Sequence, residues 1–295
     1  MTQRSMYVMG WLALALSLIS TTRPAAAEEL TGLRSPEQRS VRHSAYALPT
    51  GMWSFEPAVL GVTGEDVYGS LGIRHGFGAG FELEVNLAHY AAGLFNIGGH
   101  WSFLDTKHIA LSAAVGFTFG HGAWIWPVDP VLRDVLEDTD LFTIPFELTA
   151  TAPVLDWLQL DLSVGARYGT IWGTLGDGDN FYADAEIGAN QLMIRPGARA
   201  FVSDATAIEL FFDLPLYTSV PWEGDLTAEL RNKGYEKSGS GRATVPLSET
   251  WKFEVGVRSS FTPWMFGTVR LHYGRTNKLL YLTTVNPSIS LEFRI

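Results

Sequence analysis

The sequence lacks the residues and segments that define several common classes of protein. It contains no cysteine, which excludes disulfides and a lipid anchor attached through cysteine. Beyond the N-terminus, no apolar run approaches the length of about 18 residues that a transmembrane helix needs. Only five lysines are present, and the formal net charge is −10. A chain with this acidic balance is disfavoured as a nucleic-acid binder.

The N-terminus has the features of a secretory signal peptide. An arginine-containing start precedes an apolar run over residues 11–20, which is too short to cross a bilayer as a helix. Ala25 and Ala27 then fit the small-residue rule for signal peptidase. An uncleaved anchor helix is the alternative. The expected divisions are a cleaved signal peptide over 1–27, a periplasmic lead over 28–49 and a folded domain over 50–295.

From about residue 50 onward, apolar and polar residues alternate along the chain. This alternation indicates β-strands, because successive strand side chains point to opposite faces. In HIALSAAVGFTFG, residues 108–120, one face carries large apolar side chains and the other carries only Ala, Ser, Gly and Thr. The pattern predicts about twelve strands, at 52–60, 67–74, 81–88, 95–103, 108–120, 141–152, 158–171, 191–201, 207–217, 250–261, 265–273 and 288–295.

Short and longer connections alternate between these strands. Turn-forming residues dominate the short ones. The longest connections are expected at 121–140, 172–190 and 218–249. In the first of these, Asp129 and Pro130 look like the N-cap and first residue of a short helix that could constrict the mouth of a barrel or pack at its rim. An even number of strands places both chain ends on the short-turn side.

Together these features resemble the outer-membrane β-barrels of Gram-negative bacteria, which combine short periplasmic turns, long outer loops and strands that are apolar outside and polar inside. The resemblance covers roughly residues 50–295 and is one of architecture, with no subfamily identified. It implies an all-β fold, a closed antiparallel up-and-down transmembrane barrel, located in the outer membrane. It also implies two partners, the membrane lipids and the barrel-assembly machinery, which would contact the C-terminal strand. That strand ends in Ile295, with its aromatic residue, Phe293, two positions earlier.

Aromatic residues gather near both ends of the expected strands, as amphipathic rings do at membrane boundaries. A soluble periplasmic sandwich or barrel is the alternative fold, and it would turn the same apolar residues inward. The expected girdles are Trp53, Phe103, Trp157, Phe201, Phe261 and Trp264 on the short-turn side, and Tyr90, Phe119, Phe142, Trp172, Tyr217, Trp251 and Tyr273 on the other.

The polar face of the strands carries acids and bases in nearly equal number, which predicts ion pairs across neighbouring strands inside the barrel. Twelve strands lie between filled small barrels and open porins, so the expected function is a narrow, porin-like channel for passive passage of small polar solutes. A barrel with a closed lumen and a structural or surface-interaction role is the alternative. The candidate lumen-lining residues are Glu56, Arg74, Glu82, Glu84, Glu147, Asp161, Arg167, Arg195, Arg199, Glu209, Asp213, Lys252, Glu254, Arg258 and Arg270.

A third possibility is an outer-membrane lipid-modifying enzyme, which would need a nucleophile, a base and an orienting group within hydrogen-bond reach. His100 and Ser102 are inward neighbours on one strand, Asn96 shares their face, and His272 lies inward on another strand. These residues match no catalytic motif, and a polar lumen supplies such side chains by chance. No enzyme activity is expected, and no cofactor or metal is implied.

Overall fold

The computed structural model describes residues 44–63, 66–91, 93–122, 138–176, 181–230, 233–244, 251–275 and 283–295. Nearly all of them lie in one antiparallel sheet. No helix among these residues is long and apolar enough to cross a bilayer. The elements in chain order are β1 (Trp53–Thr63), β2 (Asp66–Gly78), β3 (Phe81–Asn86), α3 (Leu87–Ala91), β4 (Leu94–Asp105), β5 (Ala110–His121), β6 (Asp138–Leu155), β7 (Leu158–Gly176), β8 (Phe181–Ser203), β9 (Thr206–Leu230), β10 (Lys233–Thr244), β11 (Lys252–Thr262), β12 (Met265–Arg275) and β13 (Thr283–Arg294).

The sheet closes on itself into a barrel. The last strand pairs with the first, so that Ser54 lies opposite Arg294. β9 pairs with β8 on one side, and its first half pairs with β11 on the other. Its second half pairs with β10 instead, which leaves β10 outside a closed ring of the twelve remaining strands. Closure removes the free sheet edges, whose unpaired backbone groups would each cost several kcal/mol in hydrocarbon.

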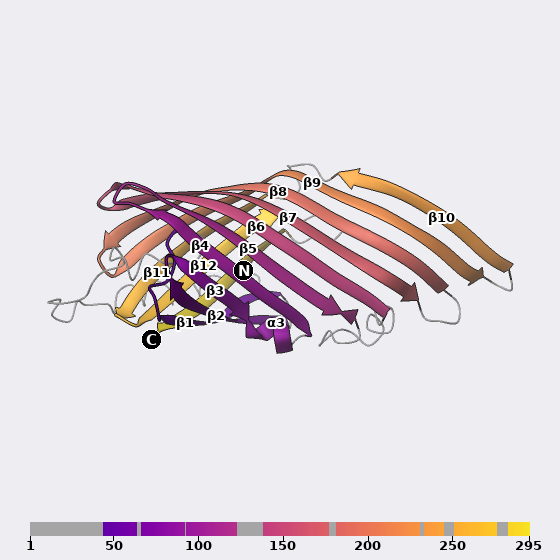
Figure 1. Ribbon diagram of the computed structural model, residues 1–295, viewed down its shortest axis with the longest axis horizontal. Helices are drawn as coiled ribbons and strands as arrows, with labels where there is room; N and C mark the ends of the chain where they lie inside the picture. Colours follow the sequence, from indigo (N-terminus) through magenta and orange to yellow (C-terminus); the bar gives the residue numbers. More distant parts are fainter. Residues whose placement is uncertain are drawn as a thin grey trace, which may run out of the picture.

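The wall of the barrel is taller on one side. Figure 1 shows β8, β9 and β10 projecting beyond the other strands at the end opposite the short turns. The expected connection at 172–190 is mostly strand, because β7 runs to Gly176 and β8 begins at Phe181. The expected connection at 218–249 holds the second half of β9 and all of β10. The prediction of long loops was wrong here. These segments contain many glycines and charged residues, but pairing with the adjacent strand keeps them extended.

Two smaller boundaries also differ from the sequence pattern. The expected strand over 81–88 ends at Asn86, because the Asn86 side-chain oxygen accepts a hydrogen bond from the Ala88 N–H at 3.0 Å. This local bond begins the short helix α3. At the connection 121–140, Asp138 to Asp140 belong to β6. The expected helix at Asp129 and Pro130 lies outside the described residues.

The apolar side chains face outward and the polar side chains face inward. On the outer side, Phe146 and Leu162 are 43% and 45% exposed. On the inner side, Thr149 and Ser163 are buried, and their hydroxyl oxygens lie 2.9 Å apart. A soluble barrel would show the reverse distribution. The orientation expected of a membrane barrel is therefore confirmed.

The bare inner face of β5 is explained by what lies against it. Ala110 is fully buried and packs against Ala45 and Tyr46, which precede β1. A side chain at Gly116 would meet the ring of Pro145 on β6, since a Cβ there would lie 2.9 Å from its Cγ. Small residues on β5 thus leave room for neighbouring strands and for the segment before β1.

That segment, the described part of the expected periplasmic lead, lies against the inner side of the wall. The Ala45 N–H donates a hydrogen bond to Thr151 Oγ1 at 2.9 Å, and the Leu48 N–H donates one to Glu82 Oε2 at 2.7 Å. We call residues 44–49 the N-terminal strap. Gly76 on β2 makes room for it, because a Cβ there would lie 2.2 Å from the Pro49 carbonyl oxygen.

The aromatic residues of the short-turn girdle include Trp53, Phe103, Trp157 and Trp264, all of which are exposed on the barrel surface. Phe201 does not belong with them. It packs against Ala207 and the fully buried Phe266. Its position in the sequence near a strand end suggested a girdle residue, but odd-numbered residues of β8, such as Arg199, point inward.

Replacing Leu162 by Arg should test the orientation of the wall. The change places a cation on the lipid-facing side of β7, near the middle of its membrane span. The expected loss is about 2–4 kcal/mol of unfolding free energy, measured by urea titration of protein refolded into phospholipid vesicles. Val202→Arg, next to a short turn, is the control and should cost less than about 1 kcal/mol. Equal losses would show that this side of β7 does not face lipid.

Candidate functional site

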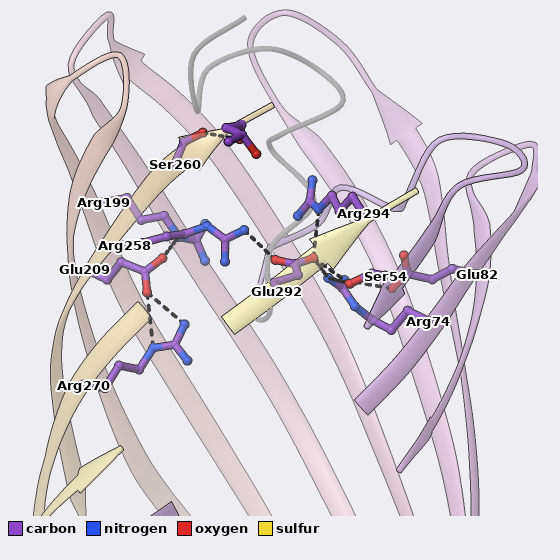
Figure 2. A network of polar contacts seen from close by, with 11 residues as sticks. Ser54, Arg74, Glu82, Arg199, Glu209, Arg258, Ser260, Arg270, Glu292 and Arg294 are labelled. Carbon is purple, nitrogen blue, oxygen red and sulfur yellow. Dashed lines mark hydrogen bonds and ion pairs between the residues drawn. The ribbon is translucent and has the colours of Figure 1, made fainter. Parts of the chain in front are cut away.

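The interior of the barrel near the short-turn end is crossed by charged side chains in two neighbouring groups (Figure 2). All of these side chains are buried, and eight different strands carry them. We call this set the interior ion-pair layer. Its members are Arg74, Glu82, Asp161, Arg199, Glu209, Arg258, Arg270, Glu292 and Arg294.

Glu292 on β13 is the centre of one half of the layer. Its carboxylate accepts hydrogen bonds from Arg74 Nη2 at 2.8 Å, from Arg258 Nη2 at 2.6 Å and from Arg294 Nε at 2.8 Å. The Ser54 hydroxyl donates a fourth at 2.7 Å. The donors come from β1, β2, β11 and β13. Charge-assisted bonds of this kind are roughly twice as strong as neutral ones, so Glu292 ties both sides of the barrel seam together.

Glu209 on β9 is the centre of the other half. It accepts hydrogen bonds from Arg199 Nε at 3.2 Å and from Arg270 Nη2 at 3.0 Å. Arg199 also reaches Asp161 on β7, with 2.9 Å between Nη1 and Oδ2. The Thr151 hydroxyl, which accepts the bond from Ala45, donates one to the same Asp161 carboxylate at 2.6 Å. The strap and the layer therefore share hydrogen-bonded partners.

Two aromatic rings lie among these charges, and the sequence analysis did not include them in the lumen. The guanidinium carbons of Arg258 and Arg294 each lie 4.8 Å from the centre of the Phe266 ring. Arg199 lies 5.2 Å from the centre of the Phe211 ring. The sequence did indicate their position, since both phenylalanines alternate in step with the inward polar residues of their strands. Such rings fill space beside cations at little electrostatic cost.

Inward-facing residues become more exposed with distance from the layer. Arg195 pairs with Asp213 and lies 3.9 Å from the partly exposed Glu147. Nearby, Lys252 pairs with the buried Glu254, which also lies 3.2 Å from His272 Nδ1. Toward the tall side of the wall, the inward charges are thus more accessible than at the layer. We call this part of the interior the vestibule.

All the sequence-predicted lumen residues lie on the inward side of their strands, but not together. Seven belong to the layer, namely Arg74, Glu82, Asp161, Arg199, Glu209, Arg258 and Arg270. Arg195, Asp213, Glu147, Lys252 and Glu254 border the vestibule. Glu56 and Glu84 are partly buried on β1 and β3, and Arg167 is exposed on β7. Glu292 and Arg294 also lie in the layer. Their inward period in the sequence places them on the polar face, although they are not in the set of candidate lumen residues.

The residues considered for catalysis do not form a catalytic arrangement. His100 Nδ1 lies 3.3 Å from Glu82 Oε1, within the layer. Within the described part of the chain, no hydrogen bond joins His100 to Ser102, and the Ser102 hydroxyl is buried without a partner. Asn96 instead bonds the backbone of Asn86 through both ends of its amide. A serine without a base in reach is not an activated nucleophile.

A closed antiparallel wall with apolar residues outside and paired charges inside defines a β-barrel of the Gram-negative outer-membrane type. No family model and no curated protein matches the sequence. Among solved structures, the chain is similar to the CymD monoaromatic hydrocarbon channel, with 11% identity, a TM-score of 0.44, and 84% of this chain and 67% of that chain covered.

Two further similarities have the same character. The toluene transporter TodX of Pseudomonas putida shares 10% identity at a TM-score of 0.42, with 89% of this chain and 70% of that chain covered. The KdgM porin shares 8% identity at a TM-score of 0.30, with 82% and 98% covered.

Replacing Glu292 by Gln should test whether the layer is closed and dry. Three guanidinium groups would lose the carboxylate that they share, and the expected loss is about 3–5 kcal/mol of unfolding free energy. Glu147→Gln is the control, because the Glu147 side chain is 28% exposed whereas that of Glu292 is 3% exposed. The control should cost less than about 1 kcal/mol. A similarly small loss for Glu292→Gln would show that water reaches the layer.

Proposed function

We propose that this protein is an outer-membrane channel for small polar solutes, described here with its pathway closed by the interior ion-pair layer and the N-terminal strap. One observation carries the proposal. Inward charged side chains are buried at the layer, whereas those of the vestibule include the partly exposed Glu147 and Lys252. This gradient is that of a water-filled mouth leading to a constriction, rather than of a uniformly packed core.

The closure has parts that can separate. The strap is held to the wall by hydrogen bonds from Ala45 and Leu48 rather than by backbone pairing into the sheet. Glu82 takes part in both the strap and the layer, because it accepts from Leu48 and lies 3.6 Å from Arg74. Displacing the strap therefore takes the Leu48 N–H away from Glu82, which is a member of the layer. The wall itself does not have to open for water to reach the ion pairs.

A closed-lumen barrel with a structural role is the second candidate, and the burial of the layer favours it. The two candidates differ in whether solutes ever cross the layer. In both, the membrane lipids surround the apolar band and the assembly machinery engages β13. Conductance of protein refolded into planar bilayers separates them, because only the channel gives current steps.

Gly76→Ala should open the channel by displacing the strap. A methyl group at this position would clash with the Leu48 and Pro49 carbonyl oxygens. We expect an open probability at least several-fold above that of the unsubstituted protein in single-channel recordings. Gly72→Ala is the matched control on the same face of β2, where the nearest atom would lie 3.9 Å away. The absence of current from all three proteins would favour the closed-lumen barrel.

Arg195→Gln should change the ion selectivity of the vestibule. The substitution leaves Asp213 and Glu147 without their cation, so the local potential becomes more negative and cations are favoured. The measurement is the reversal potential under a KCl gradient. Arg242→Gln on β10, outside the closed ring, is the control with the same change in net charge. A reversal potential unaltered in Arg195→Gln would place Arg195 outside the conducting path.

A further inference from the structure

An apolar row crosses the inner side of the tall wall, above the charged vestibule. Leu141 lies directly opposite Ile171, Ile171 opposite Ile187, and Ile187 opposite Trp222. No register shift separates Ile171 from Asp161 on β7, so the row shares the face of the inward charges. Ile171, Ile187 and Trp222 are 41%, 41% and 46% exposed.

Trp222 is held flat by the neighbouring strand. A Cβ at Gly241 of β10 would lie 2.8 Å from the indole nitrogen, and one at Gly239 would lie 3.3 Å from the ring. The two glycines therefore let the indole rest on the backbone of β10. One face of the ring is covered in this way, while much of the residue stays accessible. The result is a rigid aromatic platform beside two isoleucines.

This exposure is not explained by the membrane. The outward apolar residues are covered by lipid tails, but the row faces the opposite side, toward the mouth of the barrel. Apolar surface left in water forgoes about 25 cal/mol for each Å². Apolar patches that stay exposed beside polar groups are typical of ligand sites.

A cation without a partner lies deeper on the same face. Six inward arginines, namely Arg74, Arg195, Arg199, Arg258, Arg270 and Arg294, each have a carboxylate within ion-pair distance. Arg167 is exposed, and within the described residues it has none. It lies directly opposite Gln191, and Gln191 opposite Thr218, whose buried hydroxyl has no hydrogen-bond partner.

The space between the platform and Arg167 is lined by small residues. Ile171 lies four positions after Arg167, which corresponds to roughly 13 Å along the strand. Gly169 lies between them and faces Thr143 on one side and Ala189 on the other. The extended side chain of Arg167 reaches over part of this distance. The distance that remains matches the length of a solute with an apolar body at one end and an anionic group at the other.

We propose that the mouth of the barrel binds organic anions that carry an aromatic or alkyl body. The apolar body lies on Ile171, Ile187 and the edge of Trp222, and the carboxylate accepts charge-assisted hydrogen bonds from Arg167. This inference deepens the proposed function, because it names the class of solute that would enter the vestibule. The role of the site in transport rests on the proposed function. The binding itself does not depend on conduction.

The test is calorimetric titration of the full chain in lipid nanodiscs with 4-phenylbutyrate. Saturable binding is expected for the unsubstituted protein, with at least tenfold weaker affinity in Arg167→Gln and in Trp222→Ala. Arg167→Lys should recover part of the loss. Neutral 4-phenylbutanol and the short anion butyrate should each bind at least tenfold more weakly than 4-phenylbutyrate.

The controls are Arg242→Gln, which removes an exposed cation from β10, and Trp172→Ala, which removes an aromatic side chain from the other face of β7. Neither should change the affinity. Absence of saturable binding, or equal losses in the controls, would overturn the inference. Binding without current in planar bilayers would retain the site and reject the channel, and current without binding would do the reverse.

Discussion

The structure depends on the closure of one hydrogen-bonded wall. In hydrocarbon every backbone N–H and C=O must find a partner within the protein, and only a sheet without edges satisfies all of them. The pairing of β1 with β13 completes that wall. It also fixes which side of each strand faces lipid, since the side-chain period is two and a shift by one residue would reverse all of them. The apolar outside and the charged inside are two consequences of this pairing.

Closure then determines the electrostatics of the interior. Once Glu292 and Glu209 are turned away from lipid into a narrow lumen, each needs several donors, and arginines from neighbouring strands supply them. Burial of such charges is costly unless each one is paired. The pairs near the short turns satisfy this requirement with buried partners. Farther along the strands, inward charges such as Glu147 are more exposed.

On the tall side of the wall, the apolar and charged residues are on the opposite faces from those in the membrane-spanning part. Beyond the vestibule, the inner face carries Ile187 and Trp222, while Glu186 and Glu223 lie opposite each other on the outer face. Outside the hydrocarbon layer, lipid no longer imposes apolar residues on the outer side. Apolar residues can then be placed where a solute would meet them first. The proposed site for the apolar body of a solute lies on this part of the inner face, above the charged layer.

The sequence by itself determined the strands, the number of strands in the ring and the two faces, because the alternation of residues such as Leu162 and Ser163 is a local property of strand geometry. It also placed Phe211 and Phe266 on the inward period, although their packing against arginines could not be read from it. Tertiary structure decided the rest. It extended 172–190 and 218–249 into strands through pairing, drew residues 44–49 to the inner wall, and brought Ser54 to Glu292 across 238 positions of chain. Such contacts depend on which strands become neighbours when the barrel closes, and no local pattern records that.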